Sequence, residues 1–166
     1  WHGPRWDASF GVSAYIPTGE YDVDEPATPG KDFWTLMLTA GGTMYLDADK
    51  TWSASVLGRY ETHSEKDEVD VRLGDDFHFE WGIGKTVARG LDVGLAGYCH
   101  WQVTDDRGGD ANWDTTDHDT VYAVGPEASA FLPPAGLFVS LRSLWEFDAE
   151  DRSEGNITVL TLTKIL

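Results

Sequence analysis

The chain has 166 residues, and 29 acidic residues outnumber 12 Lys and Arg, giving a formal net charge of −17 at pH 7. This length suits a single domain over residues 1–166, and so acidic a chain lacks the positive face that nucleic-acid binding needs. The 13% aromatic content excludes a disordered acidic chain, and the single Cys excludes internal disulfides and multi-thiolate zinc sites.

Apolar and polar residues alternate with period two in eight segments, which predicts eight strands. The fourth is the sharpest, because Phe77, Phe79 and Trp81 alternate with His78 and Glu80. The last is ambiguous in phase. The eight predicted strands cover residues 5–16, 33–46, 52–61, 76–84, 91–104, 122–130, 137–147 and 157–166.

The predicted connections alternate in length. Residues 47–50, 88–90 and 133–136 are short and rich in turn-forming residues, whereas residues 17–32, 62–70, 105–119 and 148–155 are long and polar. Short turns at one end and long loops at the other predict an up-and-down meander. Most acidic residues of the chain fall in the long connections.

Three features favour a membrane over a soluble sandwich. The apolar faces run for about 9 to 11 residues almost without charge, the length of a tilted spanning strand. The opposite faces mix Gly, Ser and Thr with charges of both signs, as in a hydrated lumen. Aromatic residues lie near the strand ends, as in interfacial girdles: Trp6 and Trp52 at the short-turn end, and Trp34, Tyr60, Trp101, Trp145 and Phe147 at the long-loop end. The sequence therefore predicts an all-β, antiparallel up-and-down transmembrane β-barrel.

The polar face is expected to line the lumen with Arg59, Asp76, His78, Glu80, His100, Gln102, Glu127, Arg142 and Glu146. A narrow barrel must pair its ions, so cross-strand ion pairs are expected. Their cations would be Arg59, Arg72 and Arg142, and their carboxylates Asp7, Glu61, Glu80, Glu127 and Glu146. His78, Glu80 and His100 also raise the question of a catalytic or metal site. No nucleophile or sequence-adjacent ligand triad accompanies them, so neither an enzyme nor a metal site is predicted.

Two further features carry weaker hypotheses. Asp105, Asp106 and Asp110 are candidate Ca²⁺ ligands in an oxygen-rich loop, although no full EF-hand pattern is present and a solvated loop is favoured. Pro126 within a strand predicts a bulge or a local break in pairing. In a channel for apolar solutes such a break would serve as a lateral exit to the bilayer.

Several short motifs, in this order and spacing, resemble the outer-membrane channel family known as the meta-pathway phenol degradation protein. The motifs are Pro17-Thr18-Gly19-Glu20-Tyr21, Gly74-Asp75, Gly97-Tyr98, Gln102-Val103-Thr104-Asp105-Asp106, Val124-Gly125-Pro126 and the segment 147–155. The chain departs from the family pattern with Val71 and Leu73 before Gly74, and with Lys164-Ile165-Leu166 at its end.

The resemblance implies a monomeric bacterial outer-membrane barrel of about twelve strands. This chain would be either the C-terminal part of such a barrel, which is favoured, or a shorter relative. It implies passive uptake of small hydrophobic or aromatic molecules without a cofactor, with outer-membrane lipid and lipopolysaccharide as surroundings. The alternatives are a soluble lipocalin-like ligand-binding barrel, a structural outer-membrane barrel without transport, and an outer-membrane enzyme using the His and Glu residues of the fourth and fifth segments.

Overall fold

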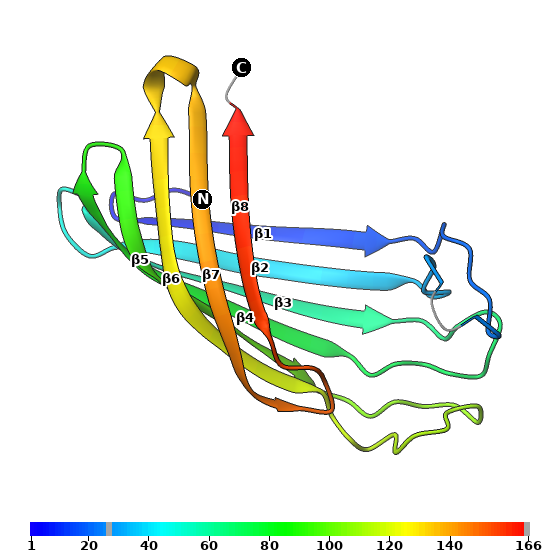
Figure 1. Ribbon diagram of the computed structural model, residues 1–166. Coiled ribbons are helices and arrows are strands. Elements are labelled where there is room, and N and C mark those ends of the chain that lie inside the picture. Colours follow the sequence, from blue (N-terminus) through cyan, green and yellow to red (C-terminus); the bar gives the residue numbers. More distant parts are fainter. Residues whose placement is uncertain (26–27, 165–166) are drawn as a thin grey trace.

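The computed structural model describes residues 1–25 and 28–164, which form one antiparallel sheet whose strand order follows the chain (Figure 1). The predicted eight-stranded meander is confirmed. The predicted end of the last strand, at Leu166, lies outside the described residues. The strands are β1 (Trp6–Tyr15), β2 (Thr35–Tyr45), β3 (Trp52–His63), β4 (Asp76–Ala88), β5 (Leu91–Gln102), β6 (Thr120–Leu132), β7 (Leu137–Glu150) and β8 (Asn156–Lys164).

The three predicted short turns connect β2 to β3, β4 to β5 and β6 to β7. Lys50, Gly90 and Gly136 adopt positive φ in them, which closes each turn tightly. The Asp47 carboxylate accepts hydrogen bonds from the backbone nitrogens of Trp52, at 2.7 Å, and Thr51, at 3.1 Å. These hydrogen bonds, with one from the Thr51 hydroxyl, lower the pKa of Asp47 because they stabilise its ionised form.

The described parts of the long connections, residues 16–25, 28–34, 64–75 and 103–119, lie together at the other end of the sheet (Figure 1). The fourth is shorter than predicted, because β7 continues to Glu150, which pairs with Thr120. A register shift between Thr120 and Tyr122 accompanies this extension, and Asp148 has a φ of 55°. The prediction that β7 ends at Phe147 is therefore wrong: the strand passes through an irregularity that breaks its alternation and then resumes pairing.

The sheet has two unlike faces. One face, which we call the outer face, carries most of the large apolar side chains and leaves them exposed, such as Phe10 at 60% and Leu95 at 50%. The sheet is curved (Figure 1), and the opposite, polar face carries a hollow. The buried apolar cluster is small and consists of Ala96, Ala123 and Leu144, packed against Tyr98. The apolar residues of this fold are thus gathered on a surface and not in a core.

Sheet closure is not seen. Within residues 1–25 and 28–164, β1 pairs with β2 and β8 pairs with β7, and no other strand pairs with either of them. Along the second edge of β1, Trp1 and Ala8 exchange two backbone hydrogen bonds of 2.8 and 2.9 Å. The predicted barrel is therefore observed as an open, curved eight-stranded sheet. The helical structure in the same residues is the 3₁₀ turn Pro133–Ala135, and they contain no helix long and apolar enough to cross a membrane.

Replacing Gly125 with Ala is expected to lower the free energy of unfolding by about 1–3 kcal/mol, the usual cost of overpacking. A Cβ atom at Gly125 would lie 1.8 Å from the backbone oxygen of Ser143, so β6 and β7 would have to separate. Denaturant titration of the protein in detergent measures the difference. Gly82→Ala is the control, since its Cβ would meet its nearest atom, the Leu95 oxygen, at 3.7 Å. Equal stability of the two variants would contradict the expectation.

Candidate functional site

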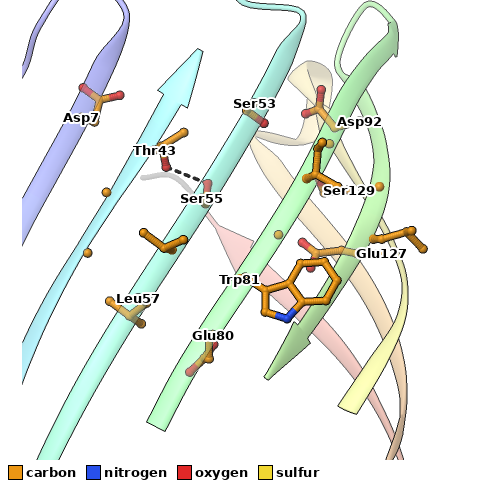
Figure 2. A pocket seen from close by; sticks show the side chains of 18 of the residues that line it. Asp7, Thr43, Ser53, Ser55, Leu57, Glu80, Trp81, Asp92, Glu127 and Ser129 are labelled. Carbon is orange, nitrogen blue, oxygen red and sulfur yellow. Dashed lines mark hydrogen bonds between the residues drawn. The ribbon is translucent and has the colours of Figure 1, made fainter. Parts of the chain in front are cut away.

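The polar face encloses a hollow of about 560 Å³ along the middle of the sheet. Its lining includes hydroxyl and carboxylate side chains from β1 to β6, and Arg142 from β7. Thr43 is hydrogen-bonded to Ser55 across β2 and β3 at 2.8 Å (Figure 2). Glycines 82, 84 and 94 lie on the same face and keep the hollow open. The hollow therefore combines polar groups with apolar lining residues such as Leu57, and the glycines leave little bulk in its floor.

A charge network crosses this hollow. Glu80 of β4 pairs with Arg59 of β3, and Arg142 of β7 lies 2.6 Å from Glu127 of β6. Arg142 also comes within 4.0 Å of Glu80, which joins the two pairs. The intervening strands carry small residues at this level, such as Ala96 opposite Gly125, which leaves room for the long Arg142 side chain. We call these four charged residues, Arg59, Glu80, Glu127 and Arg142, the charge belt.

The predicted cross-strand pairing is thus confirmed for Arg59 and Arg142. It is wrong for Arg72, which lies in the connection before β4, 3.7 Å from Asp75. The sequence pattern does not reveal the position of Arg72. Residues 71 and 72 alternate apolar and polar as a strand would, but they lie in the connection between β3 and β4. Residue 72 forms an isolated bridge with Arg107 instead.

Nearer the long loops, five side chains of β3, β4 and β5 converge on the polar face. Asp76 lies between two imidazoles: its Oδ2 is 3.2 Å from His63 Nε2 and its Oδ1 is 3.5 Å from His100 Nε2. His78 contacts His100 at 3.2 Å, and its Nε2 is 3.8 Å from Glu61 Oε1. We call Glu61, His63, Asp76, His78 and His100 the histidine cluster.

The histidine cluster is the part of the site that sequence reasoning found only in part. Asp76, His78 and His100 are predicted to line the lumen, and Glu61 is predicted on the same polar face as an ion-pair partner. His63 was missed, because it was assigned to the loop after the third strand. The available signal was the period-two spacing from Arg59 through Glu61 to His63, which continues the polar face of β3.

The other two predicted polar-face residues lie at the loop end and stabilise it. Gln102 Nε2 donates to Asp106 Oδ1 at 2.9 Å. Glu146 accepts hydrogen bonds from the Tyr98 hydroxyl and from the Gly155 backbone nitrogen, the latter at 2.8 Å. These contacts tie β5 and β7 to the loops that follow them.

Above the histidine cluster, the long loops surround a second hollow of about 530 Å³, which we call the acidic mouth. Asp76 and His100 form part of its lining. Burial raises the pKa of Asp119 in this lining, opposed by Arg152 and reinforced by the like charges of Asp76, Asp151 and Asp106. The remaining charged groups of the lining are Asp114 and Asp117.

The candidate calcium ligands serve separate hydrogen bonds and do not converge. Asp105 pairs with His118 at 2.8 Å, and Asp110 accepts from the backbone nitrogen of Asp70 at 2.8 Å. Asp106 accepts from Gly74 N and from Trp113 Nε1, both at 2.7 Å. Within the described residues, these carboxylates hold the 64–75 and 103–119 loops together.

Pro126 sits in an uninterrupted register. It pairs with Leu95 of β5, and the β6 and β7 register is the same on both sides of it, so there is no bulge at this position. The β6 to β7 pairs pass from Val124 directly to Glu127, which leaves a local gap in pairing at Gly125 and Pro126. Of the two predicted forms, the break in pairing is the one observed.

The outer face carries a row of rings near the long loops, formed by Phe77, Trp101, Tyr122 and Phe147 of β4 to β7. Successive centroids are 6.0, 5.9 and 6.0 Å apart, and the Trp101 Nε1 atom donates to the Tyr122 hydroxyl at 3.1 Å. At the short-turn end, Lys85 lies over the Trp52 ring at 4.8 Å. Of the aromatic residues predicted at the long-loop end, Trp101 and Phe147 belong to this row, which is continuous over four strands, and Trp52 lies at the short-turn end as predicted.

Comparison with known proteins gives one match. A family model described as "Putative MetA-pathway of phenol degradation" matches residues 1–162, as the motifs of the sequence predicted. Neither a curated protein nor a solved structure matches the chain.

Changing Glu80 to Gln is expected to lower the free energy of unfolding by about 1 kcal/mol, since it removes the shared anion between two arginines at a partly exposed site. Denaturant titration measures this loss. Glu154→Gln, which removes an exposed loop carboxylate, is the control and should leave stability unchanged. Equal stability of the two variants would contradict a stabilising role of the charge belt.

Proposed function

From the membership of this chain in the MetA-pathway of phenol degradation family, over residues 1–162, we propose that it forms the wall of a passive outer-membrane channel for small hydrophobic or aromatic molecules. The chain belongs to that family by a match to almost its whole length. The proposal adds the membrane, the channel and the class of solute. In this proposal the outer face contacts lipid and the polar face lines the path.

The arrangement of the two faces carries the proposal. A water-soluble sheet protein places its apolar face inward and its charges outward. Here the hollow face holds the charge belt, while large apolar side chains such as Phe10 and Leu160 are 60% and 61% exposed on the outer face. Apolar surface this extensive requires a partner, and a lipid bilayer covers such a surface on a strand meander. A lipocalin-like barrel would need the reverse arrangement.

The aromatic row supports the same placement. Trp and Tyr are favoured where lipid tails meet head groups, because each ring is apolar and each carries a polar atom. The row formed by Phe77, Trp101, Tyr122 and Phe147 lies on the outer face near the long loops, and Trp52 with Lys85 lies at the opposite end. In this proposal the aromatic residues at the two ends of the strands lie at the two interfaces of the membrane.

The free edges set a condition on the proposal. In lipid, unpaired backbone groups of β1 and β8 would each cost several kcal/mol. The proposal therefore requires that both edges pair in the membrane, with each other or with further strands. Pairing with further strands gives the wider lumen of a channel, whereas eight strands alone are filled by their own side chains.

Transport in this proposal is diffusion down a gradient, without a catalytic step. The charge belt is internally paired, so it narrows the path without presenting a net charge that would exclude neutral solutes. The gap in pairing at Gly125 and Pro126 is the proposed lateral exit, through which an apolar solute would pass from the lumen to the bilayer.

Membrane insertion is tested by an arginine on each face of β1. Phe10→Arg is expected to cost about 2–4 kcal/mol of folding free energy in liposomes, the cost of a cation on the lipid face near the bilayer midplane. Ser9→Arg, one residue away on the polar face, is the matched control and should insert like wild type. Folding into liposomes is followed by heat-dependent mobility in gels. Equal insertion of both variants would contradict the proposal.

Uptake is tested with intact cells that carry or lack the full-length protein, supplied with a labelled aromatic hydrocarbon. The protein is expected to speed entry severalfold, while entry of a labelled sugar stays unchanged. Pro126→Val should slow hydrocarbon entry without loss of folded protein in the membrane. Equal hydrocarbon entry with and without the protein would favour a structural barrel and refute the channel.

A further inference from the structure

The histidine cluster brings metal-binding atoms together, and this observation does not depend on the proposed channel function. Glu61, His63 and Asp76 each offer one ligand atom, and these atoms all lie within 4.8 Å of one another. The strand register produces this grouping, because Glu61 of β3 stands directly opposite Asp76 of β4. His63 follows Glu61 by two residues and so points to the same face.

His63 is held with one nitrogen aimed at the carboxylates. Its side chain is 7% exposed, and its Nδ1 is hydrogen-bonded to the Thr35 hydroxyl at 2.8 Å. Nε2 then faces Asp76 Oδ2 at 3.2 Å. A histidine fixed through its far nitrogen by a polar neighbour is the usual arrangement of a metal ligand, since that contact sets the orientation of the ring.

Two more imidazoles surround the same carboxylates. His100, 9% exposed, places Nε2 3.5 Å from the other oxygen of Asp76. His78 places Nε2 3.8 Å from Glu61. Three histidines and two carboxylates are therefore linked by successive contacts of 3.2 to 3.8 Å. This donor set of nitrogen and oxygen suits zinc and its neighbours better than calcium or magnesium.

A route for cations leads to this cluster. Asp76 and His100 belong both to the cluster and to the lining of the acidic mouth, whose rim carries Asp106, Asp117 and Asp151. Arg152 is the cationic side chain among the lining residues. An acidic opening of this kind raises the local concentration of divalent cations.

We propose that the histidine cluster binds one divalent transition-metal ion of the zinc class, with Glu61, His63 and Asp76 as its direct ligands. His100 holds the second Asp76 oxygen and His78 contacts Glu61, so both orient the carboxylates. The ion would cross-link β3 and β4 at the loop end of the polar face, beneath the acidic mouth.

Calorimetric titration of ZnCl₂ into the full chain in detergent tests the site. The wild type is expected to bind one tight zinc ion, and His63→Ala and Glu61→Gln are expected to weaken that binding at least about 10-fold to 100-fold, as loss of a metal-site group does. His118→Ala removes an exposed histidine that also contacts a carboxylate, Asp105, and should bind zinc as the wild type does. CaCl₂ should not compete at equal concentration.

Cobalt gives a second readout that does not depend on a variant folding. Co²⁺ bound to the wild type should show the intense visible absorption of a nitrogen and oxygen site of low coordination number, and ZnCl₂ should abolish it. Zinc binding that is equally tight in His63→Ala, or an absence of tight binding and of the cobalt spectrum in the wild type, would overturn the proposal. Both readouts are independent of solute uptake, so the metal site and the channel stand or fall separately.

Discussion

The structure depends on one constraint: alternation along the strands places the large apolar side chains on one face of a single sheet, and in residues 1–25 and 28–164 no second layer covers that face. Phe10, Leu95 and Leu160 are half-exposed or more, whereas the buried apolar cluster consists of Ala96, Ala123 and Leu144. Hydrophobic burial normally supplies most of the free energy of folding. A sheet of this kind must obtain this free energy by burying its apolar face against its surroundings. In the proposal, the bilayer is that apolar surrounding.

The same constraint shapes the polar face. Charged side chains inside a curved sheet need partners, because an unpaired buried ion is costly. Arg59 and Arg142 share Glu80, and glycines and alanines on the intervening strands give the long side chains room to meet. Nearer the long loops, the polar face carries the imidazoles and carboxylates of the histidine cluster in place of arginines. These groups are potential metal ligands.

The sequence predicted the strands, their order and the two faces, because period two runs through most of the strands and turn residues mark the short connections. It did not predict features that depend on pairing between strands. The extension of β7 to Glu150 passes through an irregularity at Asp148, and His63 joins the polar face only because β3 pairs with β2 as far as Thr35. Arg72 was misplaced since its contacts are set by a loop bridge to Arg107. Closure of the sheet is likewise a property of the edges, which no local pattern encodes.

The most direct test of the central claim is spin-label accessibility along β3 in liposomes, with Cys99 replaced and single cysteines placed in turn at residues 53 to 60. Labels at Ala54, Val56 and Tyr60 should collide with lipid-soluble oxygen, and labels at Ser53, Ser55 and Leu57 with a water-soluble nickel complex. That alternation would place the outer face in lipid. Equal exposure of both sets to the nickel complex, or the reverse alternation, would contradict the account.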